Sequence, residues 1–391
     1  MVKRLRALPW WGQVLLVFLA SRIVTTAVML AFAANQAENA WTEAKPSLIE
    51  YSTMWDAHWY FIISQTGYPS DLPLDADGHV MENAWAFMPV YPMLCRVLMA
   101  VTGMPWEIVS VGVSVLSAAG FSLLLYRLLS RVVERGALFG VALVLFSPLS
   151  PVFQVGYAES LHLLMLTAAL IAWIDRDWRM VLVLIPIMSL TRPSGLAFAF
   201  ALLLAMLLEW KRAGRWPWTL GAFVRRASLV AWGTFWGLAW LLICALVTGD
   251  LSSYTETELV WRADYIGRTE LIPFTPWIAG FTWWFGGAWG PVYLSALIAL
   301  VVIWFAKSRG PARMGEELTL WVVAYLLYLL AVFFPQSSTF RLLMPVFPLV
   351  AAFTLVQGKA AKTLIFAGLI LLQGVWIAEC WHVADYDWTP P

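Results

Sequence analysis

A single carboxylate between tryptophans is the strongest candidate for catalysis in this sequence. Asp56 lies in the segment WDAHWYFII, residues 55–63, after the first long apolar run. Four apolar residues of this segment follow the spacing i, i+4, i+7 and i+8 of one helical face: Trp55, Trp59, Ile62 and Ile63. This pattern predicts a helix that lies at the membrane surface. Asp56, one position along, can turn toward the protein and act as a general base. A solvated carboxylate in an anchor helix is the alternative.

A metal site has little support in the sequence. Asp56 and His58 form a close carboxylate–histidine pair in the candidate segment, and two ligands do not make a site. We expect a reaction that needs neither a metal nor another cofactor. Binding of a divalent cation by Asp56 and His58 stays an open alternative. The three cysteines are far apart and odd in number, so we expect structural thiols.

Charged side chains also occur within or beside apolar runs. Glu159 lies in YAESLH, Arg192 in LTRPSG, and Arg341 follows FPQSSTF. A charge at the centre of a membrane helix costs roughly 2.5–3.5 kcal/mol, and less near an interface. One interpretation is a structural ion pair of Glu159 with either arginine. The other is a polar cavity in which the arginines bind an anionic headgroup.

The composition requires a membrane protein to position these groups. The chain has 391 residues, of which 61% are hydrophobic and 13% charged, whereas soluble domains carry about 25% charged residues. This excludes a soluble globular enzyme, a disordered chain and a nucleic-acid-binding protein. The net charge of +1 agrees with the absence of a polyanion-binding surface.

Long apolar runs predict an all-α polytopic fold with about eleven transmembrane helices in a single domain, residues 1–391. The expected spans are roughly 11–34, 107–126, 137–150, 157–174, 180–191, 194–209, 227–248, 276–306, 317–334, 341–357 and 363–383. The runs at 137–150 and 180–191 are short for a full crossing. Residues 88–102 contain two prolines and an arginine, and we expect a re-entrant or outer-face helix there.

The distribution of basic residues predicts the orientation. Most of the 25 lysines and arginines fall in one set of loops, beginning with Lys3, Arg4 and Arg6. The positive-inside rule therefore places the N-terminus in the cytoplasm. We expect an uncleaved first span, a multi-pass protein of the plasma membrane, and an active site on the extracytoplasmic face.

Three external segments are expected to carry the chemistry. They are a catalytic loop with interfacial or re-entrant helices over 35–106, a second loop over 249–275, and a third over 335–341. The cytoplasmic loops contain no phosphate-binding glycine motif. A substrate met at the outer face must then come from the lipid phase or from outside.

A set of short motifs on this outer face resembles a known family. They are Trp55-Asp56-Ala57 with Trp59-Tyr60, FMPVYP at 87–92, FSPLSP at 146–151 leading to YAES at 157–160, TRPSG at 191–195, and SSTFRLLMP at 337–345. In this order the chain resembles the PIG-V-like mannosyltransferases, multi-span glycosyltransferases of the GT-C fold. The resemblance covers most of the chain.

The resemblance implies transfer of mannose from a polyprenyl-phosphate-mannose donor to a lipid-linked acceptor, such as a phosphoinositol mannoside or a lipoglycan. The family's catalytic aspartate corresponds to Asp56. Two departures matter. The Asp-x-Asp or Glu-x-Asp pair of some relatives is Asp56-Ala57-His58 here, and the family's Arg-x-Asn-Gly is Arg192-Pro193-Ser194-Gly195.

One base without a nucleophile suggests single displacement, and therefore inversion at the anomeric carbon. Three arginines are expected to stabilise the leaving phosphate: Arg341, Arg192 and Arg262. The residues expected to contact substrate are His58, Trp55, Trp59, Tyr60, Tyr157, Glu159, Ser337 and Ser338.

Two other functions stay open. One is a transferase of the same fold with another lipid-linked sugar or a protein acceptor. The other is a transporter or flippase for a lipid or small anion, which would favour internal repeats and charged sites at the membrane midplane. The sequence has no obvious repeat, and its polar groups lie toward the outer ends of the spans, which favours an enzyme.

Overall fold

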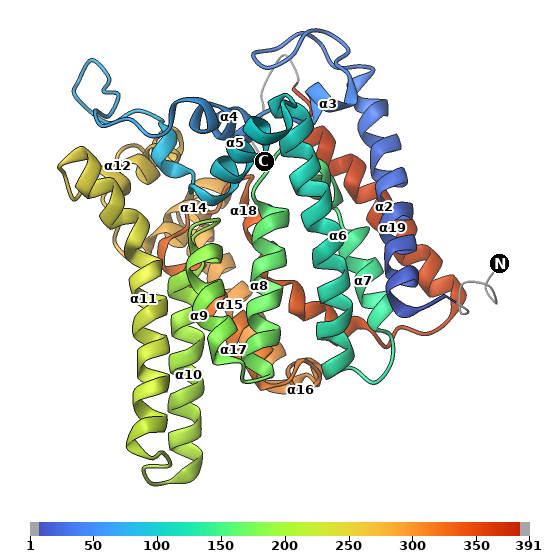
Figure 1. Ribbon diagram of the computed structural model, residues 1–391, viewed down its shortest axis with the longest axis vertical. Coiled ribbons are helices and arrows are strands. Elements are labelled where there is room, and N and C mark those ends of the chain that lie inside the picture. The colour runs from blue at the N-terminus through green and yellow to red at the C-terminus, as the bar shows by residue number, and fades with distance from the viewer. Residues whose placement is uncertain (1–7, 384–391) are drawn as a thin grey trace. The chain divides into compact units, whose positions relative to one another are not determined.

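The computed structural model describes residues 8–383, which are helical with no strand beyond a single isolated bridge between Leu74 and Val80 (Figure 1). Lys3, Arg4 and Arg6 lie outside the described residues. Five helices are long and apolar enough to cross a membrane: α2 (Trp10–Ala33), α6 (Trp106–Val132), α11 (Leu220–Thr248), α15 (Trp289–Lys307) and α19 (Lys359–Cys380). These features are those of a helical membrane protein.

The other helices are shorter, except α10, which is as long as α15 but carries three charged residues near its C-terminal end. The structure supports the predicted helical nature without testing the number of crossings. They are α3 (Leu48–Tyr51), α4 (Asp56–Thr66), α5 (Val90–Thr102), α7 (Ala137–Leu145), α8 (Glu159–Ile174), α9 (Trp178–Ser189), α10 (Gly195–Ala213), α12 (Ser253–Val260), α13 (Ala263–Ile266), α14 (Thr275–Phe285), α16 (Gly310–Met314), α17 (Glu316–Val332) and α18 (Thr339–Leu342). Three 3₁₀ turns complete the set: η1 (Ala84–Ala86), η2 (Ser150–Gln154) and η3 (Met344–Phe353).

Three expected spans differ in form. The run 276–306 is two helices, α14 and α15, separated at Gly286, whose φ is 84°. The run 341–357 is the short helix α18 followed by η3, because Pro345 and Pro348 cannot donate to a helical ladder. The run 137–150 ends as α7 at Leu145, ahead of a proline-containing turn.

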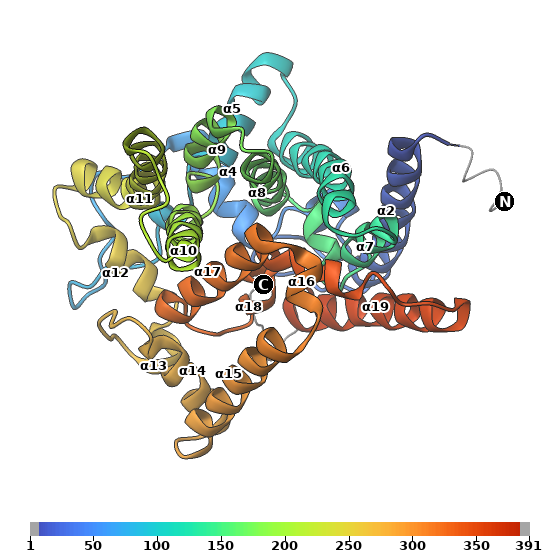
Figure 2. The same cartoon turned by 90° about the horizontal axis from the view of Figure 1, so that it is seen from below.

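Contacts group the chain into two compact units. Unit 1 comprises Met1–Gln65, Tyr91–Ile171 and Ser337–Pro391, and unit 2 comprises Thr66–Val90 and Ala172–Gln336. In unit 1, α2 packs against α6, α7 and α19 (Figure 2). Phe121 of α6 stacks against Phe153 and meets Phe347 edge-on, which joins three distant segments in one core.

A buried arginine compensates for the break after α7. Arg22, at the middle of α2, donates through Nη1 to the Ser150 carbonyl (2.9 Å) and to Gln154 Oε1 (2.9 Å). Its Nη2 donates to Ser150 Oγ (2.6 Å) and, at 3.4 Å, to the Leu145 carbonyl that α7 leaves unpaired. Arg22 is buried and satisfies backbone groups inside the helical core.

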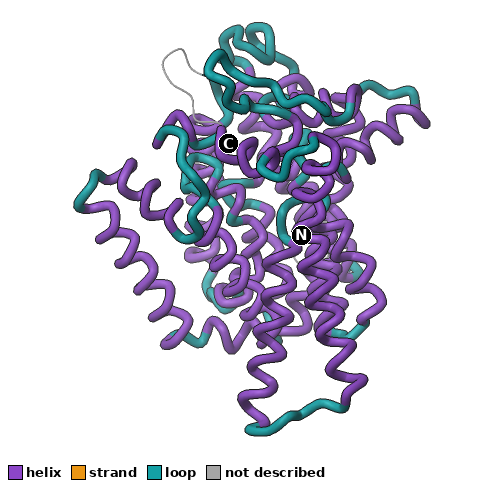
Figure 3. The backbone as a smooth tube through the Cα atoms, turned by 90° about the vertical axis from the view of Figure 1, so that its left-hand side faces the viewer, coloured by secondary structure: helices purple, strands orange, loops and turns teal. Residues whose placement is uncertain are grey.

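Unit 2 is built on the long antiparallel hairpin of α10 and α11 (Figure 3). The two helices approach closely where both carry glycine. A Cβ on Gly195 would lie 2.8 Å from the Gly237 Cα, and a Cβ on Gly237 would lie 2.5 Å from the Leu196 nitrogen. The glycine of the TRPSG motif is therefore needed for helix packing.

The end of the first predicted loop also belongs to unit 2. Trp85 and Trp240 pack with ring centroids 5.0 Å apart, and Tyr68 packs against both. Trp240 Nε1 donates to the Trp85 carbonyl (2.9 Å), and Asn83 Nδ2 donates to Thr257 Oγ1 of α12 (2.9 Å). Residues 66–90 are thus fixed to α11 and α12.

Candidate active site

The carboxylate of Asp56 forms an ion pair with Arg341 in unit 1. Nη1 of the same guanidinium lies 3.3 Å from Glu159 Oε1. The side chains of Arg341 and Glu159 are 7% and 5% exposed, and that of Asp56 is 16% exposed. Two carboxylates therefore share one buried guanidinium, and Asp56 is the member with the most access to solvent.

The start of α4 aims Asp56 at this cluster. Trp55, immediately before the helix, has a φ of 60°, a left-handed conformation that costs about 1–3 kcal/mol in a residue other than glycine. The backbone N–H of Asp56 donates to Tyr157 Oη (3.1 Å), and Trp55 Nε1 donates to the Trp381 carbonyl (3.2 Å). These bonds hold the strained turn in place.

The segment before α8 forms the other wall of the site. The N–H of Gly156 donates to the Ser52 carbonyl (2.9 Å), and a Cβ on Gly156 would lie 3.3 Å from the Ala57 Cβ. The next residue, Tyr157, is buried, and its ring lies 5.0 Å below the Arg341 guanidinium carbon. This cation–π contact supports the flat face of the guanidinium while the carboxylates hold one nitrogen.

One donor of Arg341 has no acceptor among residues 8–383. Both carboxylates contact Nη1, whereas Nε is buried and has no hydrogen-bond partner among these residues. In general, Nε and Nη2 of a guanidinium form a planar fork that matches two oxygens of a phosphate or carboxylate. A buried donor without a partner is costly, so Nε is suited to an anionic ligand.

The predicted substrate residues around α4 take different positions. Trp55 and Tyr60 are buried, Trp59 is half-buried and His58 is exposed. The helix predicted over 55–63 is present, but its apolar face is not open to lipid as expected. Trp55 packs against Trp41 with ring centroids 4.5 Å apart, and Ile63 is buried, because other parts of unit 1 cover this face.

The two predicted serines lie at the start of α18. Ser338 is buried, and its carbonyl accepts the N–H of Leu342 (3.0 Å), while Ser337 is half-buried. They belong to the turn that carries Arg341 into the cluster.

The other two predicted phosphate-binding arginines lie in unit 2. Arg262 is buried and donates through Nη2 to the Glu270 carbonyl (3.1 Å), which closes the loop around α13, and burial lowers the pKa of Arg262. The positive charge of Arg192 lowers the pKa of Glu258 in α12, and so does the nearby Tyr254 hydroxyl.

Glu258 was not singled out from the sequence, where it is one of several acids in the second loop. Desolvation by the surrounding protein raises the pKa of Glu258 to about 7, against the smaller lowering effects of Tyr254 and Arg192. The Glu258 side chain is nonetheless exposed, so water offsets part of this desolvation.

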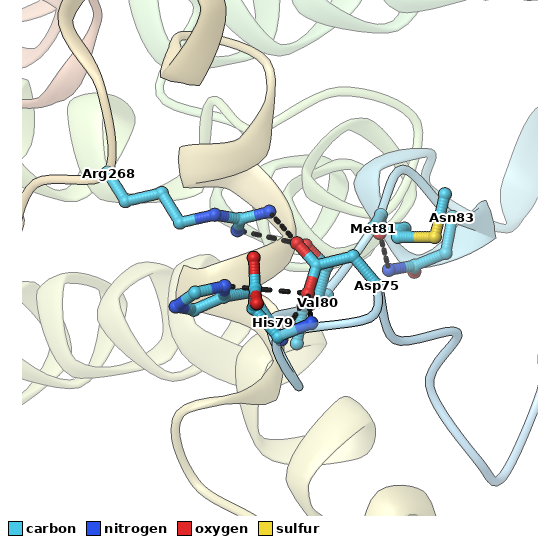
Figure 4. A network of polar contacts seen from close by, with 7 residues as sticks. Asp75, His79, Val80, Met81, Asn83 and Arg268 are labelled. Atoms are coloured by element: carbon cyan, nitrogen blue, oxygen red, sulfur yellow. Dashed lines mark hydrogen bonds and ion pairs between the residues drawn. The ribbon is translucent and has the colours of Figure 1, made fainter.

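Within residues 8–383, one group of three side chains has ligand atoms close enough to hold a metal ion: Asp75, Asp77 and His79. Asp75 also forms an ion pair with Arg268, whose Nη2 lies 2.8 Å from Asp75 Oδ2 (Figure 4). Asp75 Oδ1 accepts the backbone N–H groups of Asp77 (3.0 Å) and His79 (2.8 Å). These bonds lower the pKa of Asp75 and are those of a closed turn.

Trp381 is a supporting residue that no sequence pattern indicated. It is fully buried after α19, and its Nε1 donates to the Tyr51 carbonyl (2.9 Å) while its own carbonyl accepts from Trp55. Its ring also lies 5.5 Å from that of Tyr157. The C-terminal helix thereby braces both walls of the site.

Neither a scan against protein-family models nor a search of curated proteins found a match to this chain.

Proposed function

We propose that this protein is an inverting glycosyltransferase of the GT-C type, with about eleven membrane crossings, that moves mannose from polyprenyl-phosphate-mannose to a lipid-linked acceptor. The acceptor class includes phosphoinositol mannosides and lipoglycans. The reaction takes place on the extracytoplasmic face of the plasma membrane, with the N-terminus in the cytoplasm. The observation that carries the proposal is the shared guanidinium of Arg341, with Asp56 on Nη1 and a buried Nε that no residue among 8–383 accepts.

Asp56 acts as the general base. The acceptor hydroxyl oxygen attacks the anomeric carbon, its proton passes to the Asp56 carboxylate, and the bond from the anomeric carbon to the phosphate oxygen breaks. A β-linked donor sugar then gives an α-linked product. The partial exposure of Asp56, greater than that of either neighbour, suits a group that must meet the acceptor.

Arg341 binds the donor phosphate through Nε and Nη2. The leaving phosphate gains negative charge in the transition state, and a fixed guanidinium in a water-poor site stabilises that charge. Because Nη1 contacts Asp56, one residue sets the distance between the base and the leaving group.

Glu159 is a positioning residue in this scheme. Its carboxylate is buried beside Nη1, so it balances the guanidinium when Asp56 has taken a proton. Glu159 thus acts through Arg341 in this scheme, and the half-buried Trp59 is the candidate for stacking on the sugar.

The proposal is tested by incubating the purified full-length protein with a short-chain polyprenyl-phosphate-mannose and a panel of lipid acceptors, with and without EDTA. Radiolabelled mannose is followed into lipid product and into free sugar. We expect transfer to at least one acceptor, unchanged by EDTA. Neither transfer nor donor hydrolysis with any acceptor would refute the proposed activity.

A further inference from the structure

The hairpin of α10 and α11 ends in a loop over 214–219 (Figure 3). This loop contains Arg215, Trp216 and Trp218. An apolar groove of about 270 Å³ lies beside this loop. One wall is a stripe on α10, at Leu203, Met206, Leu207 and Trp210, whose spacing follows one helical face. The groove lies in unit 2 and shares no residue with the Asp56 cluster.

The opposite wall of the groove consists of Trp216, Trp218 and Phe223. Polar contacts hold these rings in place. Trp218 Nε1 donates to Glu209 Oε2 (2.9 Å), and Arg226 Nη2 lies 3.1 Å from the same oxygen. The Arg226 guanidinium also covers the Trp218 ring at 5.8 Å. Trp216 packs on Phe223 with ring centroids 4.8 Å apart. The shape of the groove is therefore held by specific contacts between its residues.

Three cations lie close in sequence to the residues that line the groove. Lys211 follows Trp210, Arg215 precedes Trp216, and Arg225 lies near Phe223 on the first turns of α11. All three are exposed, and none forms an ion pair with another described residue. Two neighbouring arginines do form ion pairs: Arg212 pairs with Glu316, and Arg226 pairs with Glu209. The hairpin end thus carries positive charge that its own carboxylates do not balance.

We propose that this groove binds an anionic glycerophospholipid. An acyl chain lies along the α10 stripe, and the headgroup phosphate meets Lys211, Arg215 and Arg225. The positive charge of the hairpin end favours a lipid with an anionic headgroup, whereas an apolar groove alone would accept any lipid chain. Each lysine or arginine near an anionic lipid surface contributes about 1 kcal/mol, or about fivefold in affinity.

The test uses delipidated full-length protein in detergent, titrated separately with phosphatidylglycerol and phosphatidylcholine of the same chains, and native mass spectrometry to count bound lipid. We expect tighter retention of phosphatidylglycerol. The triple variant Lys211→Gln, Arg215→Gln, Arg225→Gln should lower its affinity about 100-fold, as three fivefold effects imply. Leu207→Trp, which fills the groove without changing the charge, should lower the binding of both lipids.

A matched control removes the same charge elsewhere, at three exposed basic residues of unit 1: Arg127→Gln, Arg135→Gln and Lys359→Gln. It should retain phosphatidylglycerol as the wild type does. Equal affinity of the wild type for the two lipids, or an equal loss in the control and hairpin variants, would overturn the proposal. Gel filtration of each variant separates loss of binding from loss of fold.

Discussion

At the scale of single residues, Arg341 links the base to the predicted phosphate site. Its Nη1 is held by two carboxylates, its flat face rests on Tyr157, and its Nε has no hydrogen-bond partner among residues 8–383. Arginine suits this position because of its shape, since its three nitrogens lie in one plane and can bind different partners at the same time. A lysine would supply the same charge at a single point.

Arg341→Lys separates shape from charge. The ammonium can still balance Asp56 and Glu159, but it cannot offer the fork to phosphate. We expect a rise in the donor KM of about tenfold or more, with a small change in the acceptor KM, measured by initial rates at varied donor and acceptor concentrations. Equal changes in both KM values would assign Arg341 a purely structural role.

Arg341→Gln addresses the buried charge itself. It leaves two carboxylates side by side without a cation, and breaking a buried pair in this way costs about 3–5 kcal/mol. We expect a marked fall in the thermal unfolding temperature in detergent, larger than for Arg341→Lys. Similar unfolding temperatures for the two variants would contradict the buried triad.

Glu258 predicts a pH dependence of stability. Its pKa is raised from 4.5 to about 7, so the folded protein keeps a proton that the unfolded chain has lost. Stability contributed by this group is present below pH 4.5 and is lost as the pH rises through about 7. Glu258→Gln should flatten the unfolding temperature over this window. An unchanged slope in that variant would assign the pH dependence to other groups.

At the scale of elements, broken helices and close helix contacts decide where the site residues lie. Proline and glycine signals for some breaks are present in the sequence, at Pro345, Pro348 and Gly286. Reading these runs as continuous spans was wrong because hydrophobicity alone does not report the lost backbone hydrogen bonds. Part of the compensation comes from Arg22 and Ser150, whose side chains both donate to the Leu145 carbonyl at the end of α7.

Gly237→Ala tests the α10–α11 contact. The added Cβ would meet the Leu196 backbone nitrogen at 2.5 Å, so the helices must separate. We expect a loss of about 1–3 kcal/mol in unfolding free energy, the usual cost of overpacking, seen as a lower unfolding temperature. Gly368→Ala in α19 is the control, because its Cβ would have nothing within 4 Å. A similar drop in both variants would show that the close approach is not the cause.

At the scale of the whole molecule, the sequence predicted the helical membrane class and the members of the cluster, but not their pairing. Asp56 and Arg341 are 285 residues apart, and Glu159 had two candidate partners of equal merit. Only the packing of α4, α8 and α18 within unit 1 brings Arg341 to both carboxylates. Trp381 could not have been predicted, since its role depends on where α19 ends against Tyr51 and Trp55.

The central claim is that Asp56 is the base, and single-turnover mannose transfer with saturating donor and acceptor tests it most directly. Asp56→Asn keeps the size of the side chain and removes its basicity, so the rate should fall about 10²–10⁴-fold. Asp71→Asn, an exposed loop residue, is the matched control and should transfer at the wild-type rate. Transfer by folded Asp56→Asn at the wild-type rate would contradict the assignment.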